Sequence, residues 1–308
     1  MAILAYSNGE GVKRGKIMRL REFILRLSLC HCLSRRMKYR ILMAAVQQKQ
    51  ISNVSRLTDH LNMTFTKRMQ WLDEWASQGL YHLTEQNLQM PFITPLDAVY
   101  PRQLREIYDP PLVLYYQGDL RLLQYPSLAV VGARNISKYG ERVINQLLPG
   151  ISSSQAAIVS GLAKGVDGLA HQITLLDGGA AIGVIGTGLN GSYPRCNASL
   201  QQQVAQHGLL LTEYPLGTPP CSVNFPERNR IIAGLCHACL VIEASRRSGS
   251  LITANLALQD NRNVCAVPGP IDSPMSIGTN ELIAAGAKPI LSSQDVLEEI
   301  PDWTFLSN

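Results

Sequence analysis

Six short apolar runs after residue 127 constrain the fold of this chain more than any other sequence feature. Each run lacks the polar–apolar alternation of a half-buried strand, and helical patterns separate most of the runs. Strands that are apolar throughout are buried on both faces, as in a parallel sheet that helices cover on both sides. The sequence therefore predicts an α/β fold with an extended, Rossmann-like, doubly wound and mostly parallel sheet. The predicted strands are 128–131, 157–159, 181–185, 209–211, 238–242 and 264–267.

The chain before this region has a different character. Residues 37–80 have a helical pattern, and the pair Gln78-Gly79 is expected to end it. Residues 91–126 contain six prolines, which predicts an irregular connector with one short strand over 112–116. We therefore expect a small helical domain over 37–90, a Pro-rich connector over 91–126 and a Rossmann-like domain over 127–308.

Positive charge is concentrated at the N-terminus of the chain, whose formal net charge is +5. Residues 1–40 contain ten Lys and Arg against two Glu, whereas the remaining residues contain eighteen bases and twenty-one acids. The body of the protein is therefore slightly acidic, so global charge does not predict a nucleic-acid ligand. We expect residues 1–36 to be a basic, poorly ordered extension. No apolar run is long enough for a transmembrane helix, so the sequence predicts no membrane span.

Seven cysteines, an odd number, are typical of a protein in a reducing cytoplasm without a disulfide framework. Cys236 and Cys239 form an isolated Cys-x-x-Cys pair beside an apolar run. A zinc site needs a second ligand pair at suitable spacing, and the sequence has none near this pair. We therefore predict a cytoplasmic protein with buried cysteines and with neither a metal nor a cofactor.

Glycines and cations gather where four of the predicted strands end. Glycine lets backbone amides approach a ligand closely, and a following helix directs its free N–H groups and positive dipole end at an anion. Arg134 and Lys164 add full positive charges to this edge of the sheet. The pattern predicts a phosphate-binding rim; the alternative is that the glycines only permit tight turns. The four segments are 131–134, 159–167, 185–195 and 243–250.

Gly186, Gly188 and Gly191 match the Gly-x-Gly-x-x-Gly fingerprint of dinucleotide-binding domains. The third glycine of that fingerprint lies inside a helix, whereas the pair Tyr193-Pro194 prevents a helix here. We therefore interpret this segment as part of the rim rather than as a dinucleotide site.

Residues 225–234 read Phe-Pro-Glu-Arg-Asn-Arg-Ile-Ile-Ala-Gly and place two arginines just before an apolar helix. Residues two apart cannot share a helix face. We therefore expect one of Arg228 and Arg230 to face the rim and the other to face an internal carboxylate such as Glu243. The alternative is that both arginines form structural salt bridges.

Signals for catalysis are weak in this sequence. Ser160 and Ser250 are candidate nucleophiles, but no Gly-x-Ser-x-Gly elbow, histidine-rich set or spaced carboxylate pair accompanies them. We expect His171 to pack or form hydrogen bonds beneath the loop that contains Lys164.

Seven segments together resemble the DNA-processing protein family called DprA or Smf, over about residues 95–300. The resemblance implies an extended Rossmann-like domain that binds single-stranded DNA, forms a homodimer and loads the RecA recombinase during natural transformation. It implies no enzymatic activity. Ala133 and Asn190 depart from the residues usual in the family. The segments are VVGARNISKYG, SGLAKGVDGLAH, VIGTGLNGSYPRCN, FPERNRIIAGL, EASRRSGSLITANLA, AVPGPI and GTNELIAAGAKPI.

The resemblance also implies a DNA pocket, whose residues coincide with the predicted rim. Tyr193 and Phe225 would stack on a base or wall it, while glycine amides and cations would hold phosphates. The residues that the resemblance assigns to this pocket are Gly132, Arg134, Ser160, Gly161, Lys164, Gly186, Gly188, Tyr193, Pro194, Arg195, Phe225, Arg228, Asn229, Arg230, Ser248, Gly249 and Ser250.

Two other functions stay open from the sequence. One is a Rossmann-type nucleotide-binding enzyme such as a nucleotide N-glycosidase, although the Pro-Gly-Gly-x-Gly-Thr loop of those enzymes is missing. The other is an oligomeric scaffold. Apolar residues after Ser250 predict a two-fold interface in the C-terminal third, with RecA on an overlapping or adjacent surface; alternatively they complete the monomer core. The predicted interface residues are Leu258, Leu282, Ile283 and Ile290.

Overall fold

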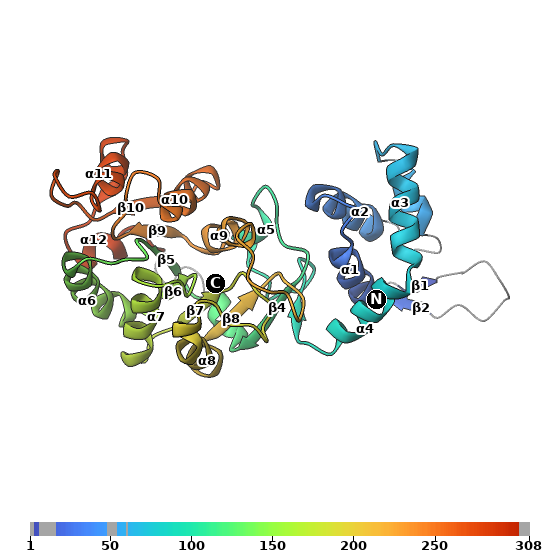
Figure 1. Cartoon of the computed structure of the whole chain (residues 1–308), viewed down its shortest axis with the longest axis horizontal. Coiled ribbons are helices and arrows are strands. Elements are labelled where there is room, and N and C mark those ends of the chain that lie inside the picture. Colours follow the sequence, from blue (N-terminus) through green and yellow to red (C-terminus); the bar gives the residue numbers. More distant parts are fainter. Residues whose placement is uncertain (1–2, 6–16, 48–53, 60, 302–308) are drawn as a thin grey trace. The chain divides into compact units, whose positions relative to one another are not determined.

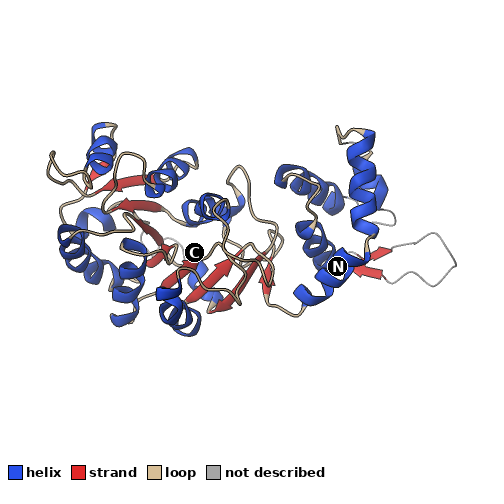
Figure 2. Cartoon of the chain, viewed as in Figure 1, coloured by secondary structure: helices blue, strands red, loops and turns tan. Residues whose placement is uncertain are grey.

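The structure, a computed structural model, describes residues 3–5, 17–47, 54–59 and 61–301 of the chain. The chain forms two compact units (Figure 1). The first unit is mainly helical, whereas the second contains a sheet with helices packed on it (Figure 2). The first unit comprises residues 1–96 and 109–114, and the second comprises 97–108 and 115–308.

A nine-stranded sheet has the order β11-β10-β9-β5-β6-β7-β8-β4-β3. The strands from β5 to β11 are parallel to one another, as the apolar runs predicted. All six predicted strands form, and their ends differ from the predicted ends by at most one residue. They are β5 (Ser127–Val131), β6 (Ala157–Ser160), β7 (Ala181–Val184), β8 (Leu209–Thr212), β9 (Ala238–Val241) and β10 (Asn263–Ala266).

Helices cover both faces of this sheet, which confirms the doubly wound α/β fold. Helices α6, α7 and α8 lie on one side of the sheet, and α9 and α10 lie on the other (Figure 1). The helices of this region are α5 (Arg102–Arg105), α6 (Lys138–Ser152), α7 (Val166–Leu176), α8 (Ala198–His207), α9 (Asn224–Leu235), α10 (Gly249–Gln259), α11 (Ile277–Ala284) and α12 (Ser293–Leu297).

The direction of winding reverses at β5. From β5 the chain adds β6, β7 and β8 on one side, and it then returns through α9 to add β9 and β10 on the other side. Strands β5 and β9 are therefore neighbours, while α6 and α10 leave their ends on opposite faces. Open α/β sheets bind ligands at the carboxyl ends of the strands beside such a switch point.

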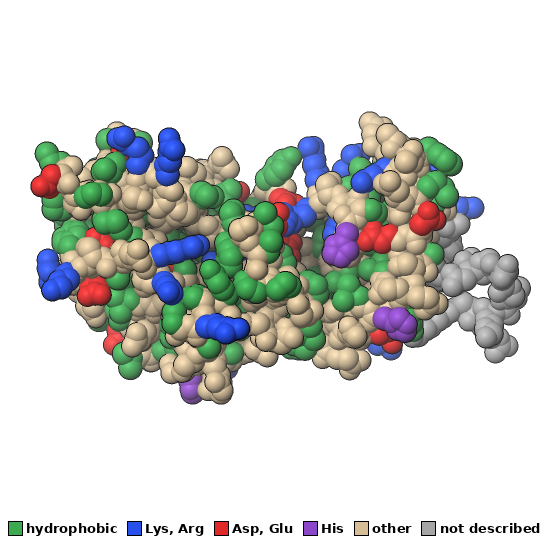
Figure 3. Space-filling model, viewed as in Figure 1, with side chains coloured by type: hydrophobic (Ala, Val, Ile, Leu, Met, Phe, Trp, Pro, Cys, Tyr) green, Lys and Arg blue, Asp and Glu red, His purple; other side chains and the backbone are tan. Residues whose placement is uncertain are grey.

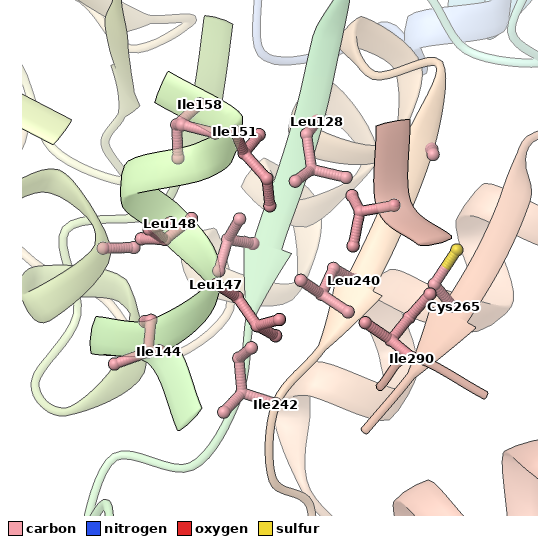
Figure 4. Packing of buried hydrophobic residues seen from close by; sticks show 14 of the residues in the cluster. Leu128, Ile144, Leu147, Leu148, Ile151, Ile158, Leu240, Ile242, Cys265 and Ile290 are labelled. Carbon is pink, nitrogen blue, oxygen red and sulfur yellow. The ribbon is translucent and has the colours of Figure 1, made fainter. Parts of the chain in front are cut away.

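Aliphatic side chains fill the core between the sheet and the helices α6, α7 and α12 (Figure 4). Leu128 and Leu240 on the central strands meet Leu147 and Ile151 on α6. Ile290 joins the same cluster and is only 2% exposed. Its assignment to a dimer interface is therefore corrected: this side chain completes the monomer core, which was the alternative left open by the sequence.

The Pro-rich segment 91–126 is more than a connector, because it supplies one edge of the sheet. The predicted strand over 112–116 forms as β4 (Leu114–Gly118), which runs antiparallel to β8 with Tyr115 opposite Thr212. The remaining outer strands are β3 (Phe92–Ile93) and β11 (Lys288–Pro289).

The helical unit begins earlier than expected. Phe23 and Ile24 of α1 are buried, so the prediction of a poorly ordered extension over 1–36 is wrong for this helix. Residues 6–16 of the predicted extension lie outside the described residues. The elements of this unit are β1 (Ile3–Ala5), β2 (Ile17–Arg19), α1 (Leu20–Leu29), α2 (Arg35–Gln47), η1 (Val54–Thr58), α3 (Phe65–Ala76) and α4 (Gln78–Leu88).

The predicted helix end at Gln78-Gly79 is instead the start of α4. The Ser77 hydroxyl accepts a hydrogen bond from the Leu80 N–H at 3.2 Å and so caps the new helix. No helix in the described part of the chain is long and apolar enough to cross a membrane.

Candidate functional site

A cavity of about 520 Å³ lies at the carboxyl ends of β5 and β9, beside the point where the winding reverses. We call it the switch-point cavity. Eight of the residues that the sequence assigned to a pocket line it, which places the centre of the predicted rim here. These eight are Gly132, Arg134, Phe225, Arg228, Asn229, Ser248, Gly249 and Ser250.

The loop after β5 forms one wall of the cavity. Arg134 is exposed at its mouth, and Gly132 is required because a β-carbon there would lie 2.6 Å from the Val166 side chain. The carboxylate of Glu243 fixes this loop by accepting hydrogen bonds from the N–H and the hydroxyl of Ser137, at 2.9 and 2.5 Å. Glu243 is therefore bound to the start of α6, and the expectation that an arginine would pair with it is wrong.

The N-terminus of α10 forms the opposite wall. Ser248 precedes the helix, and the hydroxyls of Ser248 and Ser250 are hydrogen-bonded to each other at 2.5 Å. A β-carbon at Gly249 would meet no atom within 4 Å, so the backbone is open to a ligand there. The first N–H groups of a helix have no partner within the helix and carry its positive dipole end, so this wall favours an anion.

The floor of the cavity contains two buried groups of opposite charge. Arg228 is 5% exposed and donates from Nη1 to the Val184 carbonyl at 2.6 Å. Asp167 is 8% exposed and accepts from the Gly161 N–H at 3.1 Å. Burial lowers the pKa of Arg228 and raises the pKa of Asp167, while each charge partly offsets the effect of burial on the other. Arg228 therefore places a cation, partly neutralised by Asp167, at the bottom of the cavity.

The second arginine of the pair has a structural role. One amino group of Arg230 donates to both carboxylate oxygens of Glu213, each at 2.7 Å, and thereby joins α9 to the end of β8. The structure therefore agrees with the prediction that one arginine faces the site and the other faces an internal carboxylate. Arg228 lines the cavity, and the internal partner of Arg230 is Glu213 rather than Glu243.

An aromatic pair lies at the start of α9. The Asn224 amide donates to the Gly186 carbonyl at 3.0 Å, which holds Phe225 against Gly186. The rings of Tyr193 and Phe225 lie 5.0 Å apart with an angle of 33° between their planes. Tyr193 is 44% exposed, so one face of the pair is available to a ligand.

The Gly-x-Gly-x-x-Gly segment does not form a dinucleotide site. Its last glycine precedes α8 by seven residues, and Pro194 and the short helix η3 (Arg195–Asn197) lie between them. Gly188 instead donates from its N–H to the Thr218 carbonyl at 3.1 Å. The segment is therefore a loop after β7, and its part in a phosphate-binding rim stays a prediction.

Several predicted residues lie outside the lining of the cavity. The Ser160 hydroxyl is fully buried and donates to the Val130 carbonyl at 2.7 Å, so it is not a surface nucleophile. Lys164 and Arg195 are exposed after β6 and β7. Lys and Arg side chains lie over the region of β5, β6 and β7 (Figure 3), which extends the positive rim beyond the cavity. The others outside the lining are Gly161, Gly186, Gly188, Tyr193, Pro194 and Arg230.

His171 is completely buried on α7, as a packing role predicted. Burial lowers its pKa to about 4, with a smaller contribution in the same direction from the charge of Arg228. The side chain is therefore neutral near pH 7 and has no access to a substrate.

Sequence reasoning missed part of the lining. Asp167 lies in the first turn of α7, after the cap residue Gly165, and lines the cavity. Asn135 directly follows Arg134, so its position beside a predicted cation was an available signal. The remaining lining residues gave no chemical signal in the sequence; they are Val131, Ala133, Ala163, Ile232, Ser245, Thr253 and Met275.

The described residues contain no group of three or more His, Cys, Asp or Glu side chains that could hold a metal ion. Cys236 and Cys239 are fully buried, as expected for small apolar side chains. Burial raises the pKa of the Cys236 thiol to about 12.

The reversal of winding at β5 and the cavity beside it define a doubly wound α/β protein with an anion-favouring site at its switch point. The sequence model of the family described as DNA recombination-mediator protein A matches residues 91–301, and the chain belongs to this family. It is 47% identical over 218 residues to the DNA processing protein DprA of Streptococcus pneumoniae, covering 71% of this chain and 77% of that protein. It is 45% identical over 204 residues to DprA of Bacillus subtilis, covering 66% and 69%.

Solved structures of two proteins confirm the family and the fold. The X-ray structure of DNA processing protein A from Streptococcus pneumoniae matches with a TM-score of 0.83 and 38% identity, covering 92% of this chain and 99% of that chain. A structure concerned with the single-stranded DNA binding mode of DNA processing protein A from Helicobacter pylori matches with a TM-score of 0.62. That match has 30% identity and covers 71% of this chain and 97% of that chain.

Proposed function

We propose that this protein binds single-stranded DNA at the switch-point cavity. The observation that carries the proposal is the composition of the cavity: the exposed cation of Arg134, the buried cation of Arg228 and the N–H groups at the start of α10 converge on one space. Such groups recognise phosphates without reading sequence. The likeness to a Helicobacter pylori protein with a structurally studied single-stranded DNA binding mode supports the choice of ligand.

We expect a preference for single strands over duplexes. Tyr193 and Phe225 can stack on an unpaired base, because one face of their pair is exposed. The bases of a duplex are stacked on each other and do not offer this contact. Because phosphate contacts and stacking are sequence-tolerant, we expect little preference among base sequences.

The wider role that we propose is to load the RecA recombinase on the bound strand during natural transformation. A recombinase filament needs a long strand, and two linked cavities hold such a strand more tightly through effective concentration. We therefore propose a homodimer through the C-terminal third, with RecA on an overlapping or adjacent surface. Leu258 is 53% exposed, and Leu282 and Ile283 are partly exposed, so these three side chains are the candidates for the interface.

The mode of action that we propose is binding rather than catalysis. The candidate nucleophile Ser160 is buried beneath the rim, and His171 is neutral and inaccessible. A nucleotide N-glycosidase would instead release a free base from a mononucleotide, which a chromatographic assay of the product detects.

A fluorescence anisotropy titration tests the proposed ligand. Single-stranded, duplex and mononucleotide probes are compared for the parent and for Arg134→Ala, with Arg121→Ala as control because Arg121 is exposed in a surface ion pair. We expect tight binding only for the single strand. Arg134→Ala should weaken it and lower the salt dependence by about one phosphate contact, a slope change of roughly 0.7. Equal affinity for duplex and single strand, or an Arg134→Ala variant that binds normally, would refute the assignment.

A further inference from the structure

The segment 161–165, which we call the Lys164 loop, joins β6 to α7 and has a strained backbone. Leu162 has a φ of +54°, in the left-handed region that a bulky residue rarely adopts. Its side chain is only 1% exposed, so it is packed inside the protein. A strained backbone persists only where the surrounding structure holds it. The Lys164 loop therefore depends on the contacts that its neighbours make with it.

On one side, the Lys164 loop is attached to the switch-point cavity. Gly165 packs against the loop after β5, where a β-carbon would lie 2.6 Å from the Arg134 carbonyl oxygen. At the other end of the segment, the Gly161 N–H donates to the carboxylate of Asp167 at 3.1 Å. The Lys164 loop is therefore in contact with both the mouth and the floor of the cavity.

Asn197 holds the Lys164 loop from the other side. It lies between β7 and α8, and its amide donates to the carbonyls of Leu162 and Ala163, at 3.0 and 2.9 Å. Gly168 leaves room for this amide, because a β-carbon there would lie 3.0 Å from Nδ2 of Asn197. Both hydrogen bonds fall at the strained part of the loop, so Asn197 contributes directly to holding that conformation.

The place of Asn197 in the sequence suggests a different role. It directly precedes α8, where an asparagine side chain usually accepts a hydrogen bond from the first N–H groups of its own helix. Among the described residues of α8, none donates to this side chain. The amide instead joins two loops that follow neighbouring strands, and each loop carries an exposed cation, Lys164 or Arg195.

We propose that Asn197 is a positioning residue for single-stranded DNA, because it fixes Lys164 relative to Arg195. Arg134 lies beyond the Lys164 loop, so the cations after β5, β6 and β7 keep one arrangement. A charged backbone binds more tightly to cations that are already in place, since their ordering is then not a cost of binding. The choice of DNA rests on the proposed function, whereas the attachment of the loop by Asn197 does not.

Hydrogen exchange without DNA tests the attachment. Asn197→Ala removes the amide, and Asn197→Ser does the same while keeping a residue suited to a helix start. Asn280→Ala is the matched control, because the Asn280 amide donates to the Gly269 carbonyl at 3.0 Å and its oxygen accepts from the Gly269 N–H at 3.2 Å. We expect residues 161–168 to exchange about tenfold faster in both Asn197 variants and at the parent rate in the control.

A double-variant cycle with Lys164→Ala tests the role in binding. Affinity is measured by fluorescence anisotropy for a single strand of about 15 nucleotides, a length that one protomer can hold. We expect Asn197→Ala to weaken binding about tenfold. If Asn197 acts through the Lys164 loop, the same substitution should weaken binding much less when Lys164 is already alanine. Asn280→Ala should bind like the parent.

Three results would overturn the proposal. The first is parent-like exchange of residues 161–168 in the Asn197 variants. The second is a pair of losses, from Asn197→Ala and Lys164→Ala, that multiply independently, as a general loss of stability would give. The third is an equal loss of affinity in Asn280→Ala.

Failure of the proposed function gives a different pattern. If Lys164→Ala and Arg134→Ala both bind like the parent while the Asn197 variants exchange faster, Asn197 holds the loop but the rim does not bind DNA. That result would refute the role of Asn197 in DNA binding together with the proposed site.

Discussion

Substitution of Gly161 by alanine should both destabilise the second unit and remove binding at the switch-point cavity. A β-carbon at this residue would lie 1.8 Å from Nη1 and 2.4 Å from Cζ of Arg228. The guanidinium would have to move, but it is buried and Nη1 donates to the Val184 carbonyl. The substitution therefore displaces the cation that forms the floor of the cavity.

The magnitude follows from two costs. Loss of a buried hydrogen bond from a charged donor costs about 1.5–3 kcal/mol, and insertion of a methyl group into a packed site costs about 1–3 kcal/mol. Together they reduce the free energy of unfolding by about 4 kcal/mol. For a unit of this size, each kcal/mol lowers the melting temperature by about 2–4 °C, so we expect a decrease of about 8–16 °C.

Differential scanning calorimetry measures the melting temperature, and binding is measured well below the lowered transition. Gly249→Ala is the matched control, because a β-carbon there would meet no atom within 4 Å. The control should melt like the parent. A Gly161→Ala variant that melts and binds like the parent would show that Arg228 is not confined by Gly161, and the account of the cavity floor would be refuted.

Three further predictions concern stability and assembly. Burial lowers the pKa of His171 from 6.5 to about 4. The imidazole therefore binds its second proton more tightly in the unfolded chain than in the folded protein. The free energy of unfolding, measured by urea denaturation, should therefore fall by up to roughly 3 kcal/mol as the pH decreases from 6.5 to 4. His171→Leu should remove this pH dependence. Arg230→Met should cost about 3 kcal/mol by removing the ion pair of the half-buried Glu213 carboxylate, and adding Glu213→Leu should recover most of it in the same assay. Leu258→Glu should give monomers in sedimentation equilibrium with an unchanged melting temperature, whereas Ile290→Ala should lose about 2–5 kcal/mol of stability. Monomers from Ile290→Ala together with a destabilised Leu258→Glu would place Ile290 in the interface and Leu258 in the core.

The sequence predicted the parallel sheet well because a strand buried on both faces leaves a local signal. Each apolar run from β5 to β10 is buried almost throughout and ends at residues that favour turns. The position of the loops at the carboxyl ends of these strands then follows from topology alone, since parallel strands end at one edge of the sheet. For this reason the sequence pattern was sufficient to place Gly132, Arg134 and residues 248–250 together at one site.

Partners that are distant in the sequence could not be predicted. The carboxylate that pairs with Arg230 could be any acid near α9, and only the packing of α9 against the end of β8 selects Glu213. Ile290 illustrates the same limit: an apolar residue near the C-terminus can fill the core or face a partner, and the sequence pattern is identical for both.

Local charge also concealed a helix. The arginines of α1 suggested an extension exposed to water, but Arg26 is buried and its guanidinium lies 5.0 Å from the ring of Trp75. A long cationic side chain can cover apolar surface and stack on an aromatic ring, so a basic segment can still belong to a core. The buried stripe of Phe23, Ile24 and Leu27 was the signal that identifies this helix.

The central claim is that a single strand of DNA occupies the switch-point cavity. A crystal structure with a short single-stranded oligonucleotide tests it most directly. We predict a phosphate within hydrogen-bond distance of the N–H groups of Gly249 or Ser250 and of the guanidinium of Arg134, with a base near the exposed face of Tyr193. A strand bound elsewhere on the protein, with none of its atoms in the cavity, would contradict the claim.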